Sequence, residues 1–218
     1  EATVQVRVLD TDSAPSIGVF GADGTWIEHA PPAPWLTGAQ VRDPDSPTMR
    51  GGWLLVGASL CGGWSYAYLN SFFRTVAREL CGREPSAGTA YAVMNRWAAQ
   101  APAGAEGLTA DTRFSGTRLE PQRRGSLTGM DRTNLTPANV TRAVLEGMVA
   151  ELLEFTRHPG VPRVRRIVAA GNAVRKNPAL RTIIADLAGV PCTVSCLEEA
   201  AAFGAAVIGW PAARQGPA

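Results

Sequence analysis

Histidine and cysteine are scarce in this sequence of 218 residues. The histidines are His29 and His158, and the four cysteines include one close pair, Cys192 and Cys196. Three residues separate this pair, which is not a usual spacing for zinc ligands, and neither histidine lies near it. We therefore expect no metal site built from Cys and His, and we interpret the cysteines as reduced thiols of a cytoplasmic protein.

The sequence also lacks a long apolar run and an excess of either charge. No stretch approaches the about 20 apolar residues of a transmembrane helix, and the first residues lack the basic and apolar regions of a signal peptide. The formal net charge is +2, and the densest basic group is Arg163, Arg165 and Arg166. This group precedes an apolar run, so we interpret it as a solvated strand entry. Neither a membrane nor a nucleic acid is expected as a partner.

Apolar residues make up 45% of the chain, which is enough for one core and favours a single domain over residues 1–218. Valines alternate with polar residues at 3–9, as in a half-buried strand, and further strands are predicted at 16–20, 25–28 and 53–58. The Pro- and Asp-rich residues 31–47 are expected to form an irregular surface segment. The first part of the chain therefore predicts a meander of hairpins.

Helical periodicity dominates the remainder. At 64–80 the apolar residues Tyr68, Phe72, Val76 and Leu80 share one helical face, and Gly82 ends the helix. Cap signals predict further helices at 86–100, 136–157, 177–189 and 198–209, with strands at 166–170 and 191–195. Antiparallel strands followed by alternating strands and helices predict an α/β, ribonuclease-H-like domain with a mixed sheet flanked by helices.

The first candidate site follows the strand at 166–170. Gly171 and Ala173 would let a flat ligand lie against the backbone, because neither has a bulky side chain. Asn172 and Asn177 can each donate and accept hydrogen bonds, as a purine edge requires. The alternative is an ordinary turn between a strand and a helix.

The second candidate site is the Gly62-Gly63 pair, between a strand and a long helix. A helix start with small residues presents backbone N–H groups to an anion, and the helix dipole favours negative charge there. The alternative is a tight turn that only lets strand and helix pack.

Two loops also carry polar side chains. Residues 10–16 could contact phosphate through Thr11 or Ser13, or magnesium through Asp10 or Asp12, although such residues are common turn formers. Residues 114–129 are rich in Gly, Pro and Arg and could fold over a cleft between domains. Its arginines Arg118 and Arg124 would then reach substrate or a partner domain; the alternative is surface pairing with Glu120.

Together these segments resemble the C-terminal domain of FGGY-type carbohydrate kinases, and most closely that of sedoheptulokinases. The matching segments follow the family's order: L-L-V-G-A-S-L-C-G-G at 54–63, F-S-G-T-R-L-E-P-Q-R-R-G-S-L-T-G at 114–129, N-L-T-P-A-N-V-T-R-A-V-L-E-G-M at 134–148, A-A-G-N-A-V-R-K-N-P-A-L-R at 169–181 and E-E-A-A-A-F-G-A-A-V at 198–207. They cover most of the chain, and A-S-L-C-G-G and G-N-A-V-R-K-N-P carry the likeness to sedoheptulokinase.

The resemblance implies an actin-like sugar-kinase fold that uses ATP and Mg²⁺. It places adenosine against Gly171, Asn172, Ala173 and Asn177. It places the phosphates near Gly62 and Gly63 and near the first hairpin, at Thr11 and Ser13. The turn D-T-D-S at 10–13 differs from the family's Gly-Thr-Ser turn, and its added carboxylates would repel phosphate unless magnesium intervenes.

Family members take the sugar pocket and the catalytic Asp largely from an N-terminal domain, which is not recognised in this sequence. We therefore expect no catalytic base here and a chain that is inactive alone, with that N-terminal kinase domain and a sugar as its partners. The expected reaction is transfer of the ATP γ-phosphate to sedoheptulose. A xylulokinase-like or other FGGY kinase, a non-catalytic nucleotide-binding module and an actin-like assembly ATPase are the alternatives, and a homodimer is one option for the assembly.

Overall fold

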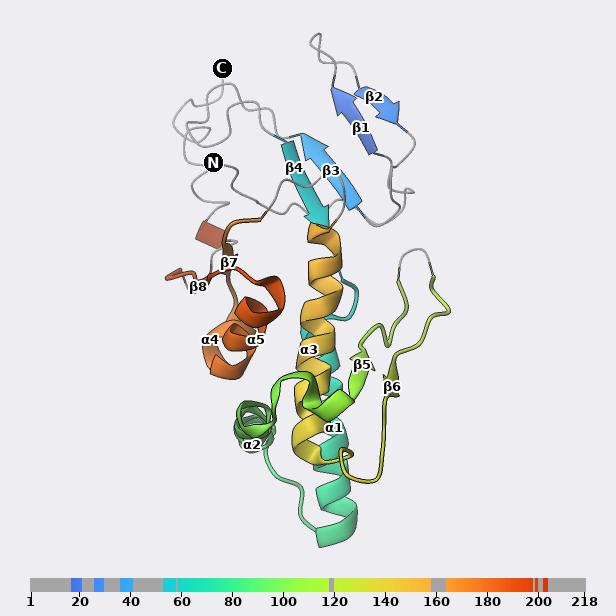
Figure 1. Cartoon of the computed structure of the whole chain (residues 1–218), viewed down its shortest axis with the longest axis vertical. Helices are drawn as coiled ribbons and strands as arrows, with labels where there is room; N and C mark the ends of the chain where they lie inside the picture. Colours follow the sequence, from blue (N-terminus) through green and yellow to red (C-terminus); the bar gives the residue numbers. More distant parts are fainter. Residues whose placement is uncertain are drawn as a thin grey trace, which may run out of the picture. The chain divides into compact units, whose positions relative to one another are not determined.

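The structure is a computed structural model that describes residues 17–20, 26–29, 36–40, 53–57, 59–117, 120–157, 164–197, 199 and 202–203. The chain divides into two compact units, each treated on its own below. One consists of residues 1–58 and 199–218, and the other of residues 59–198. Figure 1 shows the elements of both units.

The first unit contains two antiparallel hairpins. Strand β1 (Ile17–Phe20) pairs with β2 (Trp26–His29), and β3 (Leu36–Gln40) pairs with β4 (Trp53–Gly57). The strands predicted at 16–20, 25–28 and 53–58 are thus confirmed. The prediction of an irregular segment at 31–47 is wrong at 36–40, where β3 forms. Hydrogen bonds to the strongly apolar β4 satisfy the backbone groups of β3, although its own sequence shows little strand pattern. The strand predicted at 3–9 lies outside the described residues.

The second unit begins with two helices. Helix α1 (Gly62–Cys81) ends at Gly82, whose φ of 66° gives the left-handed cap that glycine adopts without strain. Helix α2 (Ala87–Gln100) begins after Ser86, whose hydroxyl accepts a hydrogen bond from the Thr89 N–H. Both helices agree with the sequence prediction.

Helix α3 (Pro137–Thr156) runs through the middle of the second unit (Figure 1). The Thr136 hydroxyl accepts a hydrogen bond from the Asn139 N–H, and proline occupies the first turn, so the predicted start is confirmed. The helix contacts α1 and α2 and supplies much of the core. Its buried apolar side chains are Ala143, Val144, Leu145, Met148, Val149 and Leu153.

A short hairpin lies against α3. Strand β5 (Thr109–Asp111) follows a 3-10 turn, η1 (Ala103–Gly107), and pairs antiparallel with β6 (Ser126–Thr128). A Cβ atom on Gly147 of α3 would collide with the carbonyl oxygen of Ala110 on β5. Glycine at this helical position therefore permits the close approach of strand and helix.

The second unit ends in the predicted strand–helix–strand arrangement, with a further short helix, α4, where only a turn was predicted before the helix that starts at Asn177. Strand β7 (Ile167–Ala169) leads through α4 (Asn172–Lys176) and α5 (Pro178–Ala188) to β8 (Cys192–Val194), which pairs with it in parallel. Buried Val174, Leu180 and Ile183 join the core that α3 provides. Of the helix predicted at 198–209, residues 199 and 202–203 are described; 202–203 are helical, and the Phe203 N–H donates to the Glu199 carbonyl at 2.9 Å.

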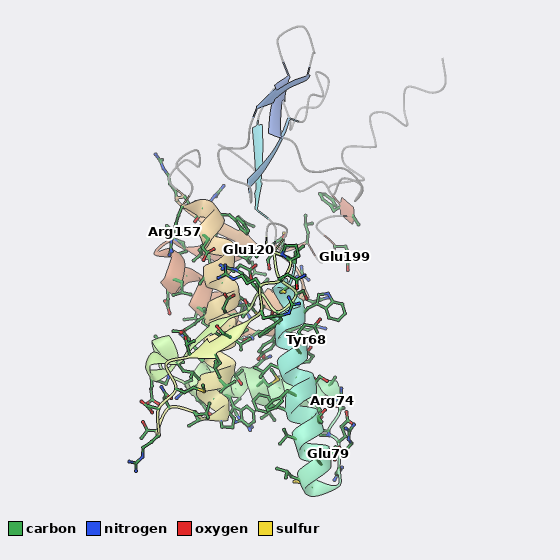
Figure 2. All side chains as sticks on the ribbon, turned by 90° about the vertical axis from the view of Figure 1, so that its right-hand side faces the viewer. Tyr68, Arg74, Glu79, Glu120, Arg157 and Glu199 are labelled. Atoms are coloured by element: carbon green, nitrogen blue, oxygen red, sulfur yellow. The ribbon has the colours of Figure 1, made fainter. Side chains whose placement is uncertain are left out.

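The apolar face predicted on α1 points to solvent in the second unit. Tyr68, Phe72 and Leu80 are 49%, 58% and 80% exposed, and Tyr68 lies on the outer side of α1 (Figure 2). The inner side of the helix carries the fully buried polar side chains Ser65 and Asn70 together with Tyr66 and Leu69, which pack against the core. The hydrogen bonds of Ser65 and Asn70 to other segments, described below, account for their burial.

Candidate functional site

The bend after β7 is open on the side of Gly171. This residue has φ 99° and ψ 168°, a conformation reserved for glycine, and begins α4. A Cβ atom added to it would meet no atom within 4 Å, and Asn172 and Ala173 are exposed. The predicted seat for a flat ligand is therefore not filled by packed side chains at these three positions.

Asn177 is placed differently from the other predicted contacts. It is only 4% exposed, and its Oδ1 accepts a hydrogen bond of 3.2 Å from the Leu180 N–H, which caps α5. Its N–H donates to the Ala173 carbonyl and closes α4. Asn177 thus fixes the junction of α4 and α5 from beneath, whereas Asn172 can offer its amide to a ligand.

A partly exposed chain of polar side chains that the sequence analysis missed supports this junction. Tyr66 of α1 donates from Oη to Asn95 Oδ1 of α2 at 2.9 Å, and Asn95 Nδ2 donates to the Lys176 carbonyl of α4 at 3.2 Å. Burial, with a smaller effect of Tyr91, raises the pKa of Tyr66 well above its usual value, and the nearby Asn177 side chain partly offsets this. The phenol therefore stays protonated and keeps its donor. A polar residue inside the apolar pattern of α2 was the only sequence signal.

The Gly62-Gly63 turn uses part of its hydrogen-bonding capacity internally. The Ser59 hydroxyl accepts from the N–H groups of Cys61 and Gly62, at 3.2 and 3.1 Å. Cβ atoms on Gly62 and Gly63 would meet nothing within 4 Å, so the turn faces open space. Among the described residues no hydrogen bond engages the Gly63 N–H. The turn can offer an anion this amide and the positive end of α1.

The loop that enters residues 114–129 is tied to the same turn. Ser65 Oγ donates to the Thr112 carbonyl at 3.0 Å, and both residues are buried. The Ser115 N–H donates to Cys61 Sγ at 3.2 Å, and the ring of Phe114 meets Tyr68 edge-on, with centroids 6.3 Å apart. The structure therefore brings this loop and the Gly62-Gly63 turn together.

Asp111 anchors the other end of the loop. Arg123 donates from Nε and Nη2 to Asp111 Oδ2, at 3.1 and 2.7 Å. Partial burial works against ionisation of Asp111, but these hydrogen bonds and the Arg113 N–H outweigh it and hold the pKa of the carboxyl below its usual value. Arg123 also pairs with Glu120 at 2.9 Å. Of the described arginines in this loop, Arg123 therefore makes the pairing with Glu120 that the sequence suggested for Arg124, whereas the same alternative for Arg118 stays untested.

Arg124 is exposed, and its Nη1 donates to the carbonyls of Pro121 and Arg123. Whether it reaches a substrate stays a prediction. Arg118, Thr11 and Ser13, and the carboxylates Asp10 and Asp12, lie outside the described residues.

The described ranges, 59–117 and 120–157 chief among them, contain neither a group of metal-binding side chains nor a membrane-spanning helix. Nowhere in them do three or more His, Cys, Asp or Glu side chains gather in a way that could hold a metal ion. None of the helices there combines the length and apolar character needed to cross a bilayer.

Comparison with known proteins identifies the architecture. The C-terminal domain of the FGGY family of carbohydrate kinases matches residues 31–213. The xylulose kinase of Haemophilus influenzae is 36% identical over 121 residues, which are 52% of this chain and 24% of that protein.

Solved structures agree on the fold. The xylulose kinase of Bifidobacterium adolescentis superposes with a TM-score of 0.53 and 24% identity, over 74% of this chain and 29% of that one. The glycerol kinase of Plasmodium falciparum, solved with ADP, gives a TM-score of 0.59 and 18% identity, over 81% of this chain and 33% of that one. This chain thus spans a third or less of the length of these relatives.

These findings confirm the predicted sugar-kinase fold, of the actin and Hsp70 superfamily, with its mixture of helices and sheet. They also confirm the family. The relatives named above are xylulose and glycerol kinases, so the finer likeness to sedoheptulokinase stays a prediction. Because the family match covers most of its length, this chain belongs to the FGGY family of carbohydrate kinases and corresponds to their C-terminal domain.

Proposed function

We propose that this chain is the ATP-binding part of a carbohydrate kinase. The observation that carries the proposal is the open bend at Gly171, with exposed Asn172 and Ala173 after the end of β7. These are the positions at which the family resemblance places adenosine. A bend filled by side chains would have removed the seat, and this one is free.

The exposed groups at the Gly171 bend and at the Gly62-Gly63 turn are of the kinds that bind the base and the phosphates of a nucleotide. The backbone at Gly171 has room for a flat ring, and the Asn172 amide can pair with a purine edge. The Gly63 N–H and the positive end of α1 suit a phosphate. Both places belong to the unit of residues 59–198, so one compact core holds them.

ATP, once bound, supplies the γ-phosphoryl group that a sugar hydroxyl attacks in line. This chain's part is to bind and orient the nucleotide, because the family resemblance places the catalytic Asp in the N-terminal domain. An N-terminal kinase domain would hold the sugar and supply the Asp that accepts the hydroxyl proton. Positioning and charge stabilisation from both sides of the phosphates would then drive the transfer, with water excluded on closure.

Magnesium belongs to this proposal as the usual companion of ATP phosphates. Its expected ligands, Asp10 or Asp12, lie outside the described residues, and the described ranges contain no metal-holding group of side chains. We therefore assign no step to it.

The sugar is proposed to be a ketose phosphorylated at its terminal hydroxyl. The segments A-S-L-C-G-G and G-N-A-V-R-K-N-P favour sedoheptulose. The 36% identity to a xylulose kinase favours D-xylulose, which is the second candidate. Measuring ADP release by the longer protein that carries this chain, with sedoheptulose, D-xylulose, gluconate and glycerol in parallel, separates these substrates.

A substitution at the bend tests the nucleotide site directly. Ala173→Leu places a larger side chain on an exposed position of α4. It should abolish measurable ATP binding in calorimetric titration without lowering Tm. Ala92→Leu, at an exposed position of α2, is the matched control and should bind ATP as the wild type does. Unchanged ATP affinity in Ala173→Leu would remove the proposed seat.

A non-catalytic nucleotide-binding module is the second candidate function. The D-T-D-S turn at 10–13 favours it, since its carboxylates would oppose phosphate. ATP binding without ADP release for any of the four sugars would support this candidate over the kinase.

A further inference from the structure

The nucleotide seat depends on a very short helix. Helix α4 spans only Asn172–Lys176, and an isolated helix of one turn is unstable in water, so contacts from outside must hold it. Its last carbonyls have no partner within the helix and are where such contacts can act. The exposed Gly171 begins this helix, and the buried Asn177 closes it.

Side chains from two other helices meet α4 at this point. Asn95 of α2 donates its Nδ2 to the Lys176 carbonyl at 3.2 Å, and its Oδ1 accepts the Tyr66 hydroxyl of α1 at 2.9 Å. The Tyr66 hydroxyl is a donor in this contact, so it fixes the orientation of the Asn95 amide and leaves Nδ2 pointing at Lys176.

The same phenol lies close to Asn177. The Asn177 Nδ2 is buried and makes no hydrogen bond of normal geometry, yet the Asn177 side chain is near enough to influence the pKa of Tyr66. Tyr66 is also stacked on Tyr91, with ring centroids 5.7 Å apart, which limits its movement. The Tyr66 ring and its hydroxyl are therefore held in place beside Asn95.

We propose that Tyr66 and Asn95 are positioning residues of the nucleotide site, which set the orientation of α4 and hence of Gly171 and Asn172. This inference rests on the proposed nucleotide binding. Both side chains act on the site through the hydrogen bond to the Lys176 carbonyl, and neither is proposed to touch the ligand. Loss of the contact lets α4 turn, so the purine side of the nucleotide is held less well.

Asn95→Asp is the sharpest test. The substitution keeps the shape of the side chain but replaces the N–H donor by a carboxylate oxygen that faces the Lys176 carbonyl. The matched control is Asn70→Asp. Asn70 Nδ2 also donates at 3.2 Å to a main-chain carbonyl, that of Ala87 at the other end of α2. Both substitutions remove an interhelical hydrogen bond to a main-chain carbonyl, but only that of Asn95 lies below α4. Asn70 is 3% exposed, whereas Asn95 is partly exposed, so Asn70→Asp is the more disruptive change and a stringent control for general loosening of the helices.

Titration calorimetry of the 218-residue chain with ATP and with adenosine gives the readout. We expect Asn95→Asp to raise Kd about tenfold for both ligands, since the base side is disturbed, and Asn70→Asp to leave Kd within about twofold. Tyr66→Phe, which keeps the ring, should raise Kd by a smaller factor. In a sugar-dependent assay of the longer protein that carries this chain, both Asn95→Asp and Tyr66→Phe should raise the KM for ATP and leave kcat unchanged.

The outcomes separate the two proposals. Absence of ATP binding by the wild-type chain would remove the proposed function and this inference with it. Wild-type binding with unchanged affinity in both Asn95→Asp and Tyr66→Phe would overturn the positioning role alone. An equal loss in Asn70→Asp would also overturn it, because the effect would then be a general loosening of the helices. If Asn95→Asp does not fold, Tyr66→Phe decides.

Discussion

Replacing Gly147 by alanine should destabilise the protein, although the same change at most helical positions is favourable. Gly147 lies inside α3, where alanine is normally worth about 0.5–1 kcal/mol over glycine. Here the new Cβ would collide with the Ala110 carbonyl of β5 and come within 3.2 Å of the Thr112 methyl group. Since the first obstacle is backbone, it cannot rotate away, and strand or helix must shift.

The magnitude follows from the two opposing effects. Inserting a methyl group into a packed contact costs about 1–3 kcal/mol, which exceeds the helical gain. We expect Gly147→Ala to lower the free energy of unfolding by about 1–2 kcal/mol, or Tm by roughly 2–8 °C in a chain of this size. Gly88→Ala is the control: Gly88 also lies in a helix, α2, and its Cβ would meet only the Ser86 hydroxyl, at 3.9 Å.

The assay is urea unfolding followed by circular dichroism, with thermal scans as a second measure. Gly88→Ala should be neutral or stabilising, whereas Gly147→Ala should shift the midpoint to lower urea. The opposite signs are the point of the comparison, because helix propensity alone predicts a gain at both positions. A Gly147→Ala protein as stable as the wild type would show that β5 does not press on α3 as the structure has it.

Two further stability predictions follow from single contacts. Thr136→Ala removes the hydroxyl that caps α3 and should lower the free energy of unfolding by about 1 kcal/mol, measured by urea unfolding, while Thr136→Ser should restore most of the loss. Asp111→Asn concerns acid stability: the folded-state pKa of Asp111 is depressed, so its contribution is present above its unfolded pKa of about 3.9 and is lost as pH falls through the lower folded-state value. Urea midpoints between pH 7 and pH 2 should therefore be lower for Asp111→Asn at neutral pH and converge on the wild type in acid; equal midpoints at pH 7 would contradict the ion pair with Arg123.

Local signals were sufficient to predict most helices. Thr136, Ser86 and Asn177 each accept a hydrogen bond from an N–H three residues on, and Gly82 adopts the left-handed cap. These interactions lie within a few residues of chain, so the sequence displays them directly. Strand β3 was missed because its pairing with β4 is made across a connection of many residues and leaves little local pattern.

The open bend at Gly171 was predictable from the sequence, whereas the cap made by Asn177 was not, and the binding of a nucleotide at this bend stays a prediction. Gly171 and its exposed neighbours lie in an open bend as predicted, yet Asn177 is buried as the cap of α5. Nothing local distinguishes an asparagine that caps a helix from one that meets a ligand, because the same donors and acceptors serve both. Asn95 was missed for a related reason: its partners, Tyr66 and Lys176, come from other helices.

The first turn of α1 links the two candidate surfaces through consecutive residues. Ser65 donates to the Thr112 carbonyl and so holds the loop beside the Gly62-Gly63 turn. Tyr66 donates to Asn95 and so supports α4 and the Gly171 bend. Neighbouring positions on a helix are about 100° apart, which lets one turn brace both sides. An anion drawn to the start of α1 would therefore act on the element that also supports the proposed adenosine seat, so we predict that phosphate binding and base binding depend on each other.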